Sequence, residues 1–215
     1  MKFQSINKNW QLAVKNALVP VVVALAFFAL VFLYYPFREK IQFDGDEGLN
    51  LMRSMLLVLD YPLYSEVTSD QPPLFTYLLS FVLRIAGFEV APARLFVLLF
   101  STLLVWAGAQ SLQLSRGKLA ALLFLPLIVI TPRYLVLSVS VMIGLPSITL
   151  AMVSLLGVML WHVQKKSGWL AFSGFALGLS VLIKLFTGFL APIFLIGLTL
   201  AAYAKNKKDG FSWKM

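Results

Sequence analysis

Long stretches without charged side chains alternate with short charged stretches along the chain. The run 16–37 holds 22 consecutive uncharged residues, enough for an α-helix that crosses a bilayer, which takes about 20 residues. The run 95–115 predicts a second spanning helix. The run 134–164 is uncharged for 31 positions, and we expect its span at about 143–162. With a shorter apolar run at 119–132, these stretches predict hydrophobic helices separated by short charged loops.

The last apolar stretch, 167–204, is interrupted only by Lys184. It is too long for one span of about 20 residues, so it predicts two helices joined by a turn near 184–188. Together the runs predict an all-α fold, a polytopic membrane helix bundle with about six spanning helices. We expect residues 1–215 to form a single transmembrane domain.

Residues 38–94 differ from the rest of the chain. Charged side chains are dense within 38–72, where apolar residues at helical spacing predict a short amphipathic helix on the membrane face: Leu49, Met52, Leu56 and Leu59. The apolar segment 74–88 that follows would reach only about 22 Å as a helix, less than the ~30 Å hydrocarbon core. We therefore expect 38–94 to be an outer loop that carries juxtamembrane helices.

The composition excludes several classes of protein. Hydrophobic residues make up 60% of the chain and charged residues 13%, and the mean hydropathy is +0.87. Soluble domains average about 45–50% apolar and about 25% charged residues, and disordered chains are less apolar still. The chain has no cysteine, and a single histidine, His162, has no partner for a zinc site. The composition therefore indicates a membrane protein without disulfides.

The distribution of Lys and Arg orients the bundle. If 74–88 does not cross the membrane, 11 of the 18 basic residues lie on the inner side, whereas only 7 do so if it crosses. Short cytoplasmic loops carry an excess of Lys and Arg, which favours the first arrangement. We therefore predict a plasma (inner) membrane protein with a cytoplasmic N-terminus and its first long loop outside. The net charge of +9 is then an orientation signal, and no nucleic-acid partner is expected.

Six titratable residues on the predicted outer side are candidates for chemistry: Asp46, Glu47, Glu66, Asp70, Arg94 and Lys184. Each has a structural alternative. Asp46 and Glu47 could complement a helix N-terminus, Asp70 could stabilise a turn, and Glu66 could be solvated only. Arg94 and Lys184 could extend to the lipid headgroups, although a cation within an apolar stretch is a functional candidate.

Four sequence blocks resemble a known enzyme superfamily. They are Asp46-Glu47-Gly48, Pro62-Leu63-Tyr64, Asp70-Gln71-Pro72-Pro73-Leu74 and Ala93-Arg94-Leu95, in this order along the chain. The pattern resembles the protein O-mannosyltransferase / aminoarabinose transferase superfamily, which are glycosyltransferases of the GT-C fold and the family 39 type. The resemblance covers nearly all of this chain but only about the N-terminal half of a usual member.

The resemblance implies transfer of a sugar from a polyprenyl-phosphate donor to a lipid, glycan or protein acceptor on the outer face of the membrane. It implies that Asp46 is the catalytic base, although Asp44 adds a third carboxylate nearby. We expect Glu47, Glu66 and Asp70 to bind substrate, and Arg94 and Lys184 to support the leaving phosphate, with bracing of the loop as the alternative for Arg94. Some members of the superfamily use a divalent metal, Mg²⁺ or Mn²⁺, and others use none.

Two other functions remain open at this point. Lys184 within an apolar stretch is also compatible with a transporter or channel subunit, and a non-catalytic membrane scaffold would need none of the six residues. The resemblance further leads us to expect that a C-terminal half is missing, through truncation or a split gene, in which case the activity of the chain alone is uncertain.

Overall fold

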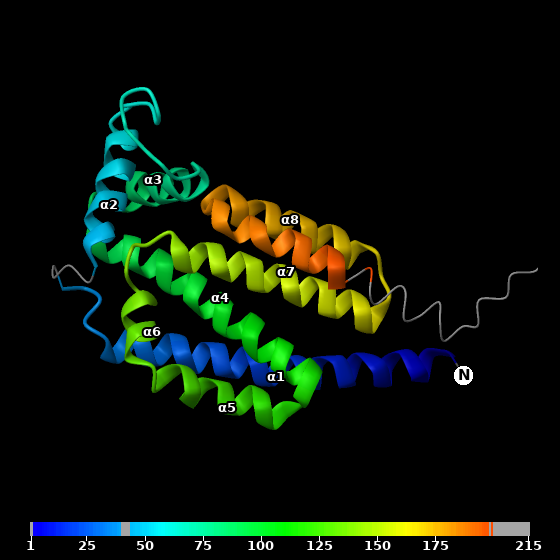
Figure 1. Cartoon of the computed structure of the whole chain (residues 1–215). Helices are drawn as coiled ribbons and strands as arrows, with labels where there is room; N and C mark the ends of the chain where they lie inside the picture. The colour runs from blue at the N-terminus through cyan, green and yellow to red at the C-terminus, as the bar shows by residue number, and fades with distance from the viewer. Residues whose placement is uncertain (1, 40–43, 198, 200–215) are drawn as a thin grey trace, which may run out of the picture.

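The computed structural model describes residues 2–39, 44–197 and 199, and it confirms the all-α class (Figure 1). Within these residues there is no β-strand, only an isolated bridge between Leu63 and Val67. The helices are α1 (Lys2–Tyr34), α2 (Gly45–Val58), α3 (Leu74–Ala86), α4 (Val90–Arg116), α5 (Lys118–Val129), α6 (Pro132–Leu137), α7 (Gly144–Gln164), α8 (Gly168–Ile183) and the 3₁₀ helix η1 (Leu185–Phe189).

Three segments in the described part of the chain are long and apolar enough to cross a membrane: Ala17–Tyr34, Val90–Arg116 and Gly144–Gln164. They correspond to the three spans expected at 16–37, 95–115 and 143–162. Shorter apolar helices, α5, α8 and Leu185–Gly197, take the places of the other expected spans. Helix α4 begins at Val90, earlier than expected, so Arg94 lies within the helix and does not open it.

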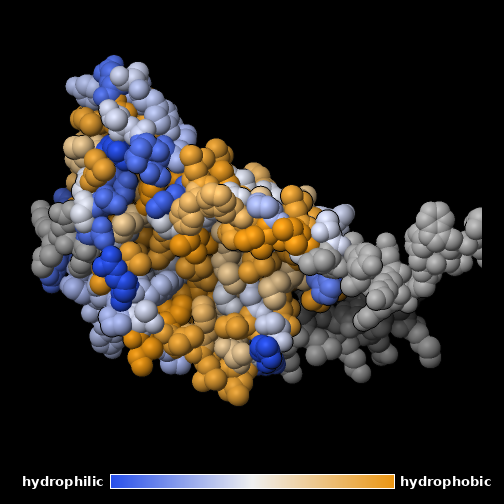
Figure 2. Space-filling model, viewed as in Figure 1, coloured by the Kyte–Doolittle hydropathy of each residue, from blue (hydrophilic) through white to orange (hydrophobic). Residues whose placement is uncertain are grey.

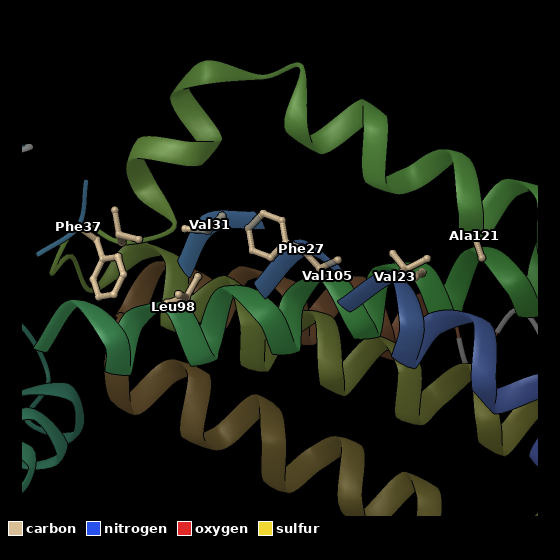
Figure 3. Close-up of a cluster of buried hydrophobic side chains, with 9 residues drawn as sticks. Val23, Phe27, Val31, Phe37, Leu98, Val105 and Ala121 are labelled. Atoms are coloured by element: carbon tan, nitrogen blue, oxygen red, sulfur yellow. The ribbon is translucent and has the colours of Figure 1, made fainter. Parts of the chain in front are cut away.

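Helices α1, α4 and α5 enclose one hydrophobic core (Figure 3). Figure 3 shows side chains from α1 and α4 facing one another, with Ala121 of α5 beside them. Most of its buried members are small or branched, and two are phenylalanines: Val23, Phe27, Val31, Phe37, Leu98, Val105, Ala109, Ala121 and Val139. In a membrane such contacts, rather than water exclusion, hold helices together.

Helix α3 stays at one end of the bundle and does not cross it. Just before α3, Asp70 pairs with Arg53 of α2, and soon after it Arg94 binds Glu47 of α2. Both ends of α3 are therefore near the same short helix. Gly87 ends α3 with a φ of +83°, a left-handed backbone that glycine adopts without strain. The apolar segment 74–88 thus turns back to the end from which it came, as its length predicts.

The buried face of α3 builds a second core against α4, α7 and the end of α8. Its members are Phe75, Leu79, Leu83, Ala93, Val97, Val141, Leu145 and Ile183. Polar surface gathers over α2 and the loop that follows it, whereas the body of the bundle is mostly apolar (Figure 2). The end of the bundle that carries α2 and α3 is therefore where polar chemistry can occur.

Helices α7 and α8 approach each other through small residues. Ser154 and Ser173 join their hydroxyl groups across the interface at 2.9 Å, and the Ser173 hydroxyl also donates to the Ser154 carbonyl at 2.8 Å. A Cβ atom at Gly157 would lie 3.0 Å from Ser173 Cβ and 3.2 Å from the Trp169 carbonyl oxygen. Such close backbone approach through small and hydroxyl residues is typical of membrane helix pairs.

Gly157→Leu is expected to destabilise the bundle, because the new side chain would push α8 away from α7. Overpacking of this kind costs about 1–3 kcal/mol, measurable as a lower midpoint of thermal unfolding in detergent. Gly174→Leu is the matched control, since a Cβ atom at Gly174 of α8 meets nothing within 4 Å. Equal midpoints for the two variants would show that the close contact at Gly157 contributes nothing.

Candidate functional site

A buried ion pair between Glu47 and Arg94 lies at the centre of the polar end of the bundle. The two side chains are only 2% and 1% exposed. Arg94 donates from Nε to Glu47 Oε1 at 2.8 Å and from Nη2 to Oε2 at 2.7 Å, which is the two-pronged geometry that a guanidinium forms with a carboxylate. This ion pair joins α2 to α4.

The same two side chains also hold two stretches of backbone. The Nη1 atom of Arg94 donates to the carbonyls of Phe37 and Glu39, which follow α1. Glu47 Oε1 accepts the backbone N–H of Val141 at 3.2 Å, and the Asn50 side chain, three residues along α2, donates to the Val141 carbonyl at 3.0 Å. The peptide groups of a buried loop are therefore satisfied by α2 side chains, as buried backbone requires.

The other two carboxylates at the start of α2 have different environments. Asp44 is the N-cap of the helix, where its side chain accepts the Asp46 N–H at 3.3 Å, and it also pairs with Arg133 at 3.3 Å. Asp46 is exposed and lines a pocket. Within the described residues no hydrogen bond or ion pair engages the Asp46 carboxylate, so it is the one available to a substrate.

This pocket has a volume of about 150 Å³ and is formed by α2, the loop before α3, the start of α7 and the end of α8. It is smaller than the roughly 300–1,000 Å³ of sites for drug-sized ligands, so it suits a head group. Its lining combines charged, polar and apolar residues: Asp46, Leu49, Asn50, Arg53, Asp70, Gln71, Met142, Ile143, Gly144 and Lys184.

Lys184 reaches the pocket because the chain breaks there between α8 and η1. Its backbone is extended, with φ −149° and ψ 119°, and its carbonyl accepts the Thr187 hydroxyl at 2.8 Å. The Ser180 hydroxyl donates to the Ser147 carbonyl at 2.7 Å and lies 2.9 Å from the Thr187 hydroxyl. These buried hydroxyl groups hold the turn against α7, so the lysine is fixed at the pocket, with its Nζ 5.2 Å from the centre of the Phe186 ring.

On the opposite side of the pocket, Arg53 of α2 meets the loop before α3. Its Nη2 atom lies 3.4 Å from Asp70 Oδ1, and the Gln71 amide donates to Asp70 Oδ2 at 2.9 Å. The hydrogen bond from Gln71, more than the nearby Arg53 charge, lowers the pKa of Asp70 below its ordinary value. Asp70 is therefore ionised at neutral pH.

The structure brings three of the six candidate residues, Asp46, Asp70 and Lys184, to this one pocket. Glu47 and Arg94 do not line the pocket and are bound to each other. Glu66 is exposed on the loop between α2 and α3 and does not line the pocket.

The pocket also contains residues that were not among the sequence candidates. Asn50 and Arg53 follow Asp46 at four and seven residues, the spacing of one helical face. That spacing was a usable signal once Asp46 was singled out. Gln71 had no such signal, because only the loop geometry brings it to the pocket.

Carboxylates in the pocket could supply at most part of a metal site. Among the described residues no group of three or more His, Cys, Asp and Glu side chains could hold a metal ion. Asp46 and Asp70 would offer two oxygen ligands to Mg²⁺ or Mn²⁺, the number that Mg²⁺ often takes from protein in phosphate sites.

A larger hollow of about 520 Å³ lies at the far ends of α4 and α7, bordered by Trp161, His162 and the helix segment that contains Ile193. Its lining includes no carboxylate and no lysine or arginine. Among the described residues its only titratable side chain is that of His162, and the rest of the lining is mostly apolar. We therefore place the candidate site in the smaller pocket, where carboxylates and cations meet.

Comparison with known protein families finds one family that matches this chain. Residues 70–211, about two-thirds of the chain, match the model of the dolichyl-phosphate-mannose-protein mannosyltransferase family. The chain belongs to this family. The resemblance found in the sequence is thereby confirmed at the level of a membrane glycosyltransferase family. The matched region of the mannosyltransferase family begins at Asp70 and includes Arg94 and Lys184, whereas Asp46 and Glu47 precede it. No curated protein and no solved structure matches the chain.

Glu47→Gln is expected to destabilise the protein strongly, because it leaves Arg94 buried without its counter-charge. Breaking a buried pair by removing one partner typically costs about 3–5 kcal/mol, and the loss can be followed by thermal unfolding in detergent. The control is Asp60→Asn, which breaks the exposed pair of Asp60 with Arg84 at 3.9 Å. Asparagine tolerates the positive φ of 67° at this position, so the control should unfold like the wild type. A wild-type midpoint for Glu47→Gln would mean that the ion pair is not needed for the fold.

Proposed function

We propose that this chain is a glycosyltransferase that moves a sugar from a polyprenyl-phosphate-linked donor to a hydroxyl group of a lipid, glycan or protein acceptor. The observation that carries the proposal is the pocket that gathers Asp46, Asp70 and Lys184 at the polar end of an otherwise apolar bundle. Membership of the mannosyltransferase family supports this choice of reaction and of donor class. A channel or scaffold gives no reason for these residues to converge.

In the proposed reaction the acceptor oxygen attacks the anomeric carbon of the donor sugar. As the new carbon–oxygen bond forms, the bond from the anomeric carbon to the phosphate oxygen breaks, and the polyprenyl phosphate leaves as an anion. The proton of the acceptor hydroxyl passes to the Asp46 carboxylate, which acts as a general base. Asp46 suits this role because its carboxylate faces the pocket without a protein partner among the described residues.

The other pocket residues have complementary roles in this proposal. A departing phosphate needs positive charge rather than a strong acid, and Lys184 supplies a cation within the pocket. Asp70, which is ionised, would orient hydroxyl groups of the donor sugar or the acceptor. Glu47 and Arg94 would act indirectly, because their ion pair holds α2 and thereby the position of Asp46.

Asp46→Asn is expected to reduce sugar transfer by about 10²–10⁴-fold, the usual contribution of a general base. The assay follows transfer from a polyprenyl-phosphate sugar by the purified chain, and donor binding should persist in the variant. Asp60→Asn removes a carboxylate of the neighbouring loop outside the pocket and should keep wild-type turnover. Undiminished turnover by Asp46→Asn would overturn the assignment of the base. Solute flux through liposomes without any transfer would instead favour a transporter.

We further propose that the pocket faces the outside of the plasma (inner) membrane and that the N-terminus is cytoplasmic. In support, α4 and α7 lead from the pocket end to turns that carry Arg116, Lys118, Lys165 and Lys166, and such basic clusters mark cytoplasmic loops.

A topology reporter fused after Lys118 should therefore read cytoplasmic, whereas one fused after Ser65, in the loop between α2 and α3, should read external. The two fusions control for each other, because both residues are exposed. The reverse pair of readings would invert the proposed orientation.

A further inference from the structure

Arg53 is a largely buried cation at the pocket, and most of its hydrogen-bonding capacity is unused. Its side chain is 12% exposed, and its Nε atom is buried with no hydrogen-bond partner among the described residues. Within the described residues its one ion pair is the contact of Nη2 with Asp70 Oδ1 at 3.4 Å, longer than the ordinary 2.7–3.2 Å of a hydrogen bond. A guanidinium offers five N–H donors, so most of them have no protein acceptor here.

We infer that Arg53, together with Lys184, binds the phosphate group of the lipid-linked donor. The two cations come from α2 and from the end of α8 and line the same pocket of about 150 Å³. A phosphate offers several oxygen acceptors, and an arginine recognises it through two parallel hydrogen bonds while a lysine supplies a point charge. This assignment rests on the proposed function and identifies a residue outside the sequence candidates.

Burial explains why an anionic ligand belongs beside Arg53. Leaving a buried charged donor without an acceptor is unfavourable, and the long contact to Asp70 satisfies it only weakly. The Asp70 side chain is 74% exposed and is also held by Gln71, so it can release Arg53 without becoming unpaired. In this arrangement Asp70 is a weak competitor that the donor phosphate displaces from Arg53.

Arg94 cannot take this role in the same structure. Its Nε and Nη2 atoms are bound to Glu47 and its Nη1 atom to two carbonyls, and its side chain is 1% exposed. A phosphate could reach it only by breaking the ion pair that joins α2 to α4. The contact to phosphate therefore falls to Arg53.

The test is equilibrium binding of polyprenyl phosphate to the full chain in lipid nanodiscs. Arg53→Gln should weaken binding by about tenfold or more, the fold-change that corresponds to the loss of one charge-assisted hydrogen bond. Arg53→Lys should keep part of the affinity, because the charge remains. Arg84→Gln, which removes an arginine of α3 outside the pocket, should bind as the wild type does. Thermal midpoints near that of the wild type would show that the variants are folded.

Two further ligands show which part of the donor is recognised. Polyprenol, which lacks the phosphate, should bind equally to the wild type and to Arg53→Gln, and inorganic phosphate should displace polyprenyl phosphate from the wild type. Asp70→Asn should bind polyprenyl phosphate at least as tightly as the wild type, because it removes the competing carboxylate. Equal affinity of Arg53→Gln and the wild type for polyprenyl phosphate would overturn the inference, as would a tenfold loss in Asp70→Asn.

The sugar-transfer assay separates this inference from the proposed function. Binding that depends on Arg53 without any transfer by the wild type would uphold the phosphate site and refute the glycosyltransferase. If Arg53→Gln transfers sugar at the wild-type rate, with the wild-type dependence on donor concentration, the glycosyltransferase is upheld and the phosphate site is refuted.

Discussion

The ion pair between Glu47 and Arg94 is the constraint on which the polar end of this bundle depends. It joins α2 to α4, and its spare hydrogen-bonding groups hold the carbonyls after α1 and the N–H of Val141 before α7. A charge so deeply buried is tolerated only when it is paired and hydrogen-bonded throughout. The buried residues of α2, Glu47, Asn50 and Ser54, are all polar, so a set of directional bonds determines where α2 lies.

One face of helix α2 packs against the protein, and an adjacent face lines the pocket. Consecutive helical residues point about 100° apart, so Asp46 and Glu47 cannot serve the same surroundings. Glu47 and Ser54 face the protein and are buried, while Asp46 and Arg53, seven residues apart, reach the pocket. Asn50 lies between the two faces, since it lines the pocket and also donates to the Val141 carbonyl. Fixing the buried face against α4 and Val141 therefore also fixes the direction of the Asp46 carboxylate.

The side of the pocket that carries Lys184 is held by hydroxyl groups. Lys184 lies at a break in an apolar stretch, where the hydroxyl groups of Ser180 and Thr187 donate to the carbonyls of Ser147 and Lys184. Irregular backbone within a membrane protein survives only where protein groups replace the missing helical bonds. Hydrogen bonds between neutral side chains and backbone therefore hold the turn that places Lys184 at the pocket.

The sequence by itself determined the helical class, the position of the three long helices and the return of 74–88 to one end of the bundle, because these depend on local hydropathy and on length. It also singled out Asp46, Asp70 and Lys184. Only the tertiary structure decided that these three line one pocket, that Glu47 and Arg94 bind each other, and that Arg53 and Gln71 join the site. Residues 47 and 94, which bind each other, and residues 53 and 184, which line one pocket, are far apart along the chain. No hydropathy pattern encodes that they come together. Those contacts depend on how helices pack, which the apolar runs leave open because lipid and protein interiors are equally apolar.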